Sequence, residues 1–130
     1  MKNSFTLSAT FPTTPETLYN AWLDSETHTA MTGGETATCN PEVGGSFTAW
    51  DGYIEGENLE LDPGKRIVQA WRTTAFQESD PDSKLEILFE PVPIGTKLRL
   101  NHSNIPDGGA DYEKGWEDYY FVPMREFFGK

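Results

Sequence analysis

The sequence predicts an α+β domain in which helices lie against a curved antiparallel sheet of about six or seven strands. Three features of the 130-residue chain lead to this prediction. A strand-like pattern opens the chain, followed by two short helix-like segments. The middle alternates apolar stretches with turn residues, and the last part repeats aromatic residues every three or four positions. A chain of this length forms one core, so we expect a single domain over residues 1–130.

The first element is predicted as a strand, because apolar and hydroxyl side chains alternate from Phe5 to Phe11. Thr13 and Glu16 then have the spacing of a capping box, and Pro15 fits the first turn of a helix. We therefore expect one helix to begin here and a second short helix to follow it. The second helix should end near Met31, just before a Gly-Gly pair.

The segment from Glu35 to Ser103 has the pattern of strands joined by turns, which predicts an antiparallel meander. Asp51-Gly52 favours a tight hairpin turn with positive φ. Pro63-Gly64 occupies the two central positions of a type II turn. The last strand places a histidine on the same face as two leucines, namely Leu98, Leu100 and His102.

The C-terminal segment is expected to form a long helix of about five turns with one aromatic face. The residues that define this face are Tyr112, Trp116, Tyr119, Tyr120, Pro123 and Phe127. Burial of one such aromatic ring contributes up to about 4–6 kcal/mol, which outweighs a cost of about 3 kcal/mol for proline inside a helix. We therefore expect the helix to continue through Pro123 with a kink near Tyr119, or else to end early.

The charge balance excludes several classes of partner. Ten Lys and Arg against 21 Asp and Glu give a formal charge of −11. This field repels phosphate backbones and anionic lipid headgroups, so we expect no nucleic-acid or membrane partner. The sequence also shows neither a targeting segment nor an apolar stretch long enough to span a membrane. Cys39 is the single cysteine, which rules out an internal disulfide and predicts a reducing, cytoplasmic location.

The motifs of common enzyme classes do not occur in the sequence. It has no nucleophile elbow, no P-loop and no dinucleotide-binding loop. With His28 and His102 as the two histidines, no His-Glu-x-x-His pair can form, and we expect no metal and no cofactor. Cys39 has no neighbouring base in the sequence, so a packed thiol is favoured over a nucleophile. We therefore predict a non-enzymatic protein with no catalytic residue.

A curved sheet around a long helix can leave an internal space, and the inward-facing residues are candidates to line it. The candidate ligand-binding residues are Phe47, Trp71, Ile87, Leu98, Leu100, His102, Trp116 and Tyr120. His102 is either a polar group at the mouth of an apolar cavity or a strand-end histidine satisfied by a backbone carbonyl. Trp71, which shares a face with Gln69, either lines the space or belongs to the plain core. The expected ligand is a hydrophobic small molecule.

Several motifs, in their order and spacing, resemble those of the activator-of-heat-shock-protein-90-ATPase homologue family. They are the strand Phe5 to Phe11, Thr14-Pro15-Glu16-Thr17-Leu18-Tyr19, Gly44-Gly45-Ser46-Phe47, Asp51-Gly52, Pro63-Gly64-Lys65-Arg66-Ile67-Val68 with Trp71, and Gly115-Trp116-Glu117-Asp118-Tyr119-Tyr120-Phe121. The resemblance runs from Ser4 to Gly129. It implies the helix-grip fold that START-like and birch-pollen-allergen-like domains share, with the sheet wrapped around the C-terminal helix.

The resemblance implies two kinds of partner. The wider superfamily mostly binds hydrophobic ligands, which supports the cavity as the first hypothesis. Eukaryotic co-chaperones of the family carry this module as their C-terminal half, beside a separate N-terminal domain that binds the middle segment of the chaperone. The alternative is therefore a stress-related, co-chaperone-like protein that acts through its surface on a heat-shock-protein-90 homologue.

Two further expectations follow. A few members of the superfamily are cyclases, so a third hypothesis is a cyclase or lyase that uses His102 as acid or base. Sheet edges and exposed aromatic residues favour self-association, so a homodimer is also expected.

Overall fold

The computed structural model describes residues 3–34, 36–106 and 111–129. Seven antiparallel strands form one sheet in the order β1-β7-β6-β5-β4-β3-β2. The strands are β1 (Asn3–Phe11), β2 (Thr38–Cys39), β3 (Ser46–Ala49), β4 (Ile54–Asp62), β5 (Arg66–Thr73), β6 (Ser83–Val92) and β7 (Gly95–Ile105). The helical segments are α1 (Pro15–Leu23), α2 (Ser25–Met31), α3 (Tyr112–Trp116), the π-helical η1 (Glu117–Phe121) and α4 (Val122–Phe128).

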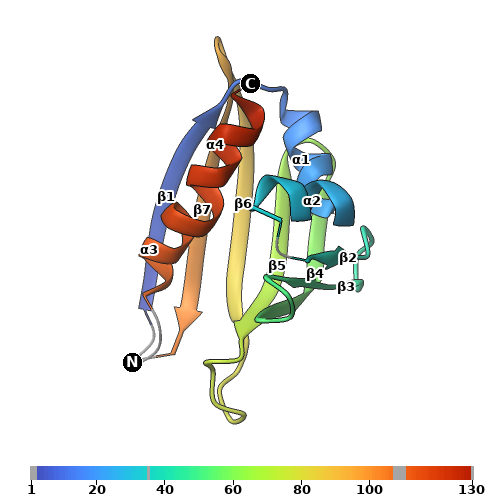
Figure 1. Ribbon diagram of the computed structural model, residues 1–130. Helices are drawn as coiled ribbons and strands as arrows, with labels where there is room; N and C mark the ends of the chain where they lie inside the picture. The colour runs from blue at the N-terminus through green and yellow to red at the C-terminus, as the bar shows by residue number, and fades with distance from the viewer. Residues whose placement is uncertain (1–2, 35, 107–110, 130) are drawn as a thin grey trace.

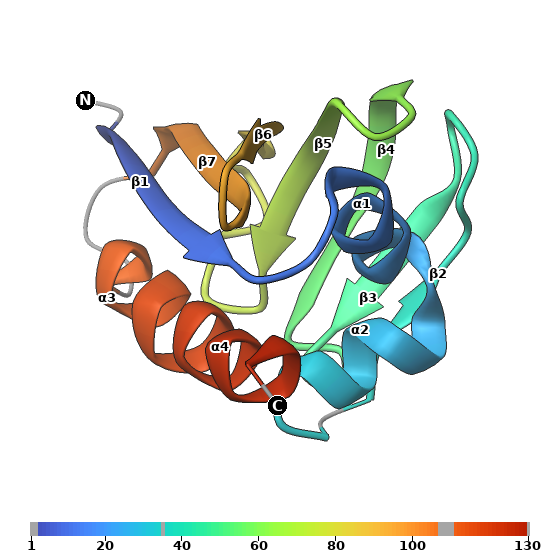
Figure 2. The ribbon, with the colours of Figure 1, turned by 90° about the horizontal axis from the view of Figure 1, so that it is seen from above.

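The sheet curves, and the helices lie together on its concave side (Figures 1 and 2). The chain runs as a meander from β2 to β7, and β1 then pairs with β7 at the far edge. The predicted α+β helix-grip fold is therefore confirmed. The core lies between the concave face and the helices, where the largest fully buried apolar side chains include Phe11, Leu18, Ile67, Leu85, Phe121 and Met124.

The two N-terminal helices form where expected, with a different cap on the first. Thr14 rather than Thr13 is the N-cap of α1, and its hydroxyl accepts a hydrogen bond from the N–H of Thr17 at 3.1 Å. The reason is Pro15, which forces the preceding residue into an extended conformation and so makes that residue the cap. Asp24 ends α1 and caps α2 in the same manner.

The two predicted hairpin turns are confirmed. In the β3–β4 turn, Asp51 and Gly52 have φ of 58° and 92°, and Trp50 also lies in the left-handed region at 53°. In the β4–β5 turn, Gly64 has φ of 74°, and the N–H of Lys65 donates to the carbonyl of Asp62 at 2.9 Å. The predicted face of β7 is also confirmed, since the structure buries Leu98, Leu100 and His102 completely.

The C-terminal helix is continuous from Tyr112 to Phe128 and contains a π-turn in its middle. The N–H of Val122 donates to the carbonyl of Glu117, five residues back. This wide turn lies directly before Pro123, whose ring clashes with the carbonyl of the preceding turn in a regular α-helix. The irregularity expected near Tyr119 is thus a π-turn, and the alternative that the helix ends early is wrong.

The π-turn shifts the buried face of the helix by one residue. Phe121 and Met124 are fully buried, whereas Tyr119 is 57% and Phe127 is 40% exposed. The prediction that Tyr119 and Phe127 belong to the buried aromatic face is therefore wrong. Its physical reason is the extra residue in the π-turn. Tyr119 lies inside this turn, and Phe127, which follows it, is rotated by about 100° relative to a uniform α-helix.

Candidate functional site

A pocket lies between the β3–β4 hairpin turn and the first half of the C-terminal helix, and we call it the aromatic pocket. Its volume is about 310 Å³, at the lower end of the range of small-molecule sites. It is lined by Trp50, Tyr53, Ile54, Trp71, Tyr112, Gly115, Trp116, Tyr119 and Tyr120. Seven of these nine residues are Trp or Tyr, and none carries a charge.

The rings of the aromatic pocket meet at steep angles. The interplanar angles are 86° for Trp71 and Tyr112, 67° for Trp50 and Tyr119, and 59° for Trp116 and Tyr120. The centroids of these pairs lie 5.2, 5.2 and 4.7 Å apart. Trp71 and Trp116 lie at a smaller angle of 38°, so the walls face several directions without forming a regular box.

Two local features at the aromatic pocket cost stability. Trp50 holds a left-handed backbone conformation, with φ of 53°, which is unfavourable for a bulky side chain. Its Nε1 is buried and has no hydrogen-bond partner within the described part of the chain. A buried unpaired donor costs about 1–3 kcal/mol. The opposite wall includes Tyr119 of η1, and π-turns occur frequently at functional sites.

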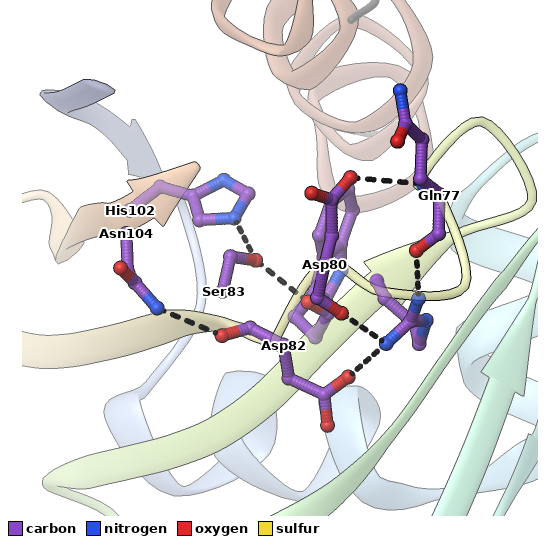
Figure 3. Close-up of polar contacts among 8 residues, drawn as sticks. Gln77, Asp80, Asp82, Ser83, His102 and Asn104 are labelled. Carbon is purple, nitrogen blue, oxygen red and sulfur yellow. Dashed lines mark hydrogen bonds and ion pairs between the residues drawn. The ribbon is translucent and has the colours of Figure 1, made fainter. Parts of the chain in front are cut away.

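His102 lies behind the aromatic pocket, in the buried face of β7. The N–H of Trp116 donates to Nδ1 of His102 at 3.1 Å. The Ser83 hydroxyl donates to the carbonyl of Trp71 at 2.6 Å, so Nε2–H of His102 must donate to the Ser83 oxygen, 2.8 Å away (Figure 3). Burial lowers the pKa of His102 to about 3, which keeps the ring neutral. His102 is thus satisfied by two side chains and matches neither interpretation from the sequence.

The loop before Ser83 is fixed by a network around Arg72 (Figure 3). The guanidinium donates to the carbonyl of Gln77 at 3.0 Å and pairs with the carboxylate of Asp82 at 2.9 Å. Asn104 of β7 donates to the carbonyl of Asp82 at 3.1 Å. These contacts position Ser83 between His102 and β5.

His28 forms a second buried contact with the C-terminal helix. Its Nδ1–H donates to the carbonyl of Trp22 at 2.8 Å, because a carbonyl can only accept. Its Nε2 therefore accepts from the hydroxyl of Tyr120 at 2.6 Å. Burial lowers the pKa of His28 to about 4. The two aromatic donors, Trp116 and Tyr120, thus bind two neutral histidines, His102 of β7 and His28 of α2.

The structure brings only part of the predicted binding set to the aromatic pocket. Trp71, Trp116 and Tyr120 line it. The other five candidates are buried in the core and do not line this pocket, namely Phe47, Ile87, Leu98, Leu100 and His102. The buried face of each strand was predicted correctly, but these five side chains are packed in the core. Ligand binding by these three lining residues stays a prediction.

Six lining residues were not among the predicted binding residues, namely Trp50, Tyr53, Ile54, Tyr112, Gly115 and Tyr119. Trp50 and Tyr53 flank the Asp51-Gly52 turn, and two large aromatic residues beside a tight, solvent-exposed turn are an available signal. Tyr119 was placed on the buried face because the π-turn has no signature in the periodicity. The sequence alone therefore predicted three buried lining residues but missed the more exposed Trp50, Tyr53 and Tyr119.

The remaining candidate chemistry is sparse. Among the residues that the structure describes, no group of three or more His, Cys, Asp or Glu side chains is arranged to hold a metal ion. No helix in this same part of the chain has both the length and the apolar character needed to cross a membrane. Burial raises the pKa of the Cys39 thiol to about 11, which disfavours the reactive thiolate.

Comparison with known proteins gives consistent matches over nearly the whole chain. The profile of the family described as "Activator of Hsp90 ATPase homolog 1-like protein" matches residues 12–129. The chain is 33% identical over 125 residues to the human "Activator of 90 kDa heat shock protein ATPase homolog 1", covering 95% of this chain and 36% of that protein. This chain thus spans about a third of the length of that curated relative.

Solved structures show the same relationship. An HSP90 activator from Plasmodium falciparum superposes with a TM-score of 0.87 at 31% identity, over 97% of this chain and 96% of that chain. A solution structure described as the Aha1 dimer from Colwellia psychrerythraea gives a TM-score of 0.75 at 16% identity, over 97% and 93% of the two chains. At this lower identity the likeness shows a shared fold alone.

Proposed function

Since the chain belongs to the family of activator of Hsp90 ATPase homolog 1-like proteins, we propose that it binds an Hsp90-type chaperone and modulates its ATPase. The observation that supports this proposal is the extent of the match, which includes nearly every residue of the chain. The match covers only part of the human relative, so the proposal concerns the contribution of this one module.

The direct test is calorimetric titration of the purified protein into the purified Hsp90-type chaperone of the same organism, with the ATPase rate measured in parallel. We expect a Kd in the micromolar range, equivalent to about −7 to −8 kcal/mol, and an altered ATPase rate. Absence of both heat and rate change up to roughly 100 µM, a limit near −5.4 kcal/mol, contradicts the proposal.

Exposed apolar residues allow the contact surface to be located without unfolding the protein. Val43, Ile94 and Tyr119 are 65%, 76% and 57% exposed and lie in three separate parts of the chain. Replacing each by Ser should leave the thermal midpoint nearly unchanged, because exposed sites contribute little to stability. We expect the replacement inside the contact surface to weaken chaperone binding while the other two act as matched controls.

A second candidate function is the binding of a hydrophobic small molecule, and the aromatic pocket favours it. The pocket lies between the C-terminal helix and the sheet-side hairpin, is largely pre-formed and is lined by apolar rings. Native mass spectrometry of protein purified gently from its own host tests this function. A reproducible excess mass that disappears on denaturation supports it, and saturating titration with aromatic probes without any binding contradicts it.

We propose a non-enzymatic role. The hypothesis of a cyclase or lyase requires His102 to reach a ligand and exchange a proton near neutral pH. His102 is fully buried, does not line the aromatic pocket and has its pKa lowered to about 3. Loss of a measured turnover in a folded His102→Gln variant would contradict this proposal.

We also propose a homodimer and a cytoplasmic setting. Strand β1 forms one edge of the sheet and offers nine residues for pairing with a second copy. Sedimentation equilibrium should show a species of twice the chain mass, which is 14.6 kDa. A single species of 14.6 kDa up to high concentration contradicts the dimer. The free Cys39 thiol is compatible with a reducing compartment.

A further inference from the structure

Acidic side chains surround the aromatic pocket along the chain. Asp51 directly follows Trp50, Asp111 and Glu113 flank Tyr112, and Asp118 precedes Tyr119, whereas Glu55 follows Ile54 on the opposite face of β4. All five are exposed. The basic residues next to lining positions are Lys114 and Arg72, and each forms an ion pair, with Asp118 at 2.6 Å and with Asp82 at 2.9 Å. These acidic neighbours and the net charge of −11 favour a cation over an anion near the pocket.

From this combination of aromatic walls and surrounding acidic charge, we propose that the aromatic pocket binds a small organic cation of the alkylated ammonium class. The inference rests on the proposed ligand-binding function and specifies the chemistry of the ligand. It is independent of the proposed action on a chaperone.

The walls favour a cation because the face of an aromatic ring carries partial negative charge. A cation over a Trp or Tyr face gains about 2- to 30-fold in affinity, with the larger values in desolvated sites. Of the seven aromatic rings in this lining, those of Tyr53 and Tyr119 are 40% and 57% exposed and that of Trp50 is half-buried, so a cation can meet these three rings. An anion would meet the same ring faces and the acidic surroundings with repulsion.

The lining also selects among cations. A primary ammonium has three N–H donors, and each one loses its water partners when it enters a site with few acceptors. A quaternary ammonium has no N–H to satisfy and carries an apolar methyl surface. The pocket volume of about 310 Å³ accommodates a head group of this kind with a short apolar substituent.

The cost of building the pocket is a further argument for a binding role. The left-handed backbone of Trp50 and its buried, unpartnered Nε1 both reduce stability, so packing alone does not explain this residue. Tyr119, which packs against the Trp50 ring at 5.2 Å, is 57% exposed and forms part of the rim. A ligand cation would bring together ring faces from the hairpin and the helix.

The test compares choline with 3,3-dimethyl-1-butanol, which has the same shape with a carbon atom in place of the charged nitrogen. Ligand-observed NMR follows the methyl protons, whose resonances move upfield beside the faces of aromatic rings. We expect choline to bind at least about fivefold more tightly than the neutral alcohol. Its affinity should fall as salt is added, whereas that of the alcohol should not.

Gly115 offers a way to close the pocket without disturbing the fold. A Cβ at this position meets only Cδ2 of Tyr119, at 3.9 Å, so a side chain can enter the pocket space. Gly115→Leu should abolish choline binding. Val122→Leu is the matched control, because Val122 is 40% exposed on the same helix and does not line the pocket.

The outcomes separate this inference from the function on which it rests. Equal or tighter binding of the neutral alcohol overturns the inference and leaves the ligand-binding function standing. Absence of any shift with choline overturns the inference, whereas the ligand-binding function is overturned only if the aromatic probes also fail to bind. Choline binding that survives in a folded Gly115→Leu variant also overturns the inference, because the cation then binds elsewhere.

Discussion

The two buried histidines predict a steep loss of stability in mild acid. The unfolded chain binds a proton on each imidazole with a pKa near 6.5, whereas burial lowers the pKa to about 4 for His28 and about 3 for His102. Between these limits the unfolded state holds more protons than the folded state, so acid favours unfolding. At pH 5 each imidazole of the unfolded chain is protonated rather than neutral in a ratio of about 30 to 1. Each histidine then lowers the free energy of unfolding by about 2 kcal/mol.

The two histidines together should lower the free energy of unfolding by about 4 kcal/mol between roughly pH 7.5 and pH 5. This is a large share of a typical stability of about 5–15 kcal/mol. The carboxylates of Asp24 and Glu86, whose pKa values are lowered by hydrogen bonds, act in the same direction but at lower pH. The chosen window therefore isolates the histidines.

Urea unfolding followed by tryptophan fluorescence at several pH values in this window provides the measurement. A His28→Gln variant should show about half of the wild-type pH dependence, roughly 2 kcal/mol over the same range. If the wild-type free energy of unfolding is flat from about pH 7.5 to pH 5, the two rings are not buried as neutral groups and the reasoning fails.

Three other perturbations test the packing. Gly56→Ala should destabilise by about 3 kcal/mol or more in urea unfolding, because its Cβ would clash with the carbonyl oxygen of Ala70 in β5. A variant of wild-type stability contradicts this contact. Tyr120→Phe leaves Nε2 of His28 without its donor and should cost about 1–3 kcal/mol, while Tyr119→Phe at the exposed position should cost almost nothing. Cys39 should react far more slowly with an aromatic disulfide reagent at about pH 8 than the thiol of an unfolded chain, whose pKa is near 8.5. The reason is burial, which raises the pKa of the Cys39 thiol to about 11. Equal reaction rates contradict the burial of Cys39.

Short-range patterns in the sequence were sufficient to predict most of the fold. A period of two placed Leu98, Leu100 and His102 in the core, and turn chemistry located the hairpin at Asp51-Gly52. These predictions succeed because side-chain alternation and positive φ depend only on neighbouring residues. They specify which face of a strand is buried, but not what covers it.

The aromatic pocket could not be predicted in the same way, because its walls come from elements far apart in the chain. Trp50 contacts Tyr119 of the helix only because the curved sheet brings the β3–β4 turn next to the helix. Tyr119 itself lies inside the π-turn, where side-chain directions differ from those of a uniform α-helix. Neither the sheet curvature nor the inserted residue has a periodic signal in the sequence.

The buried histidines and the aromatic pocket share two side chains of the C-terminal helix. Trp116 and Tyr120 present their rings to the pocket and donate hydrogen bonds behind it, to His102 and His28. Each donor has one acceptor among buried side chains, so any slip of the helix would leave buried polar groups unpaired at about 1–3 kcal/mol each. The two pairs therefore fix the register of the helix, and with it the position of the two rings that the pocket requires. His28 and His102 thus act on the pocket as positioning residues, through the rings they hold, and need no contact with a ligand to do so.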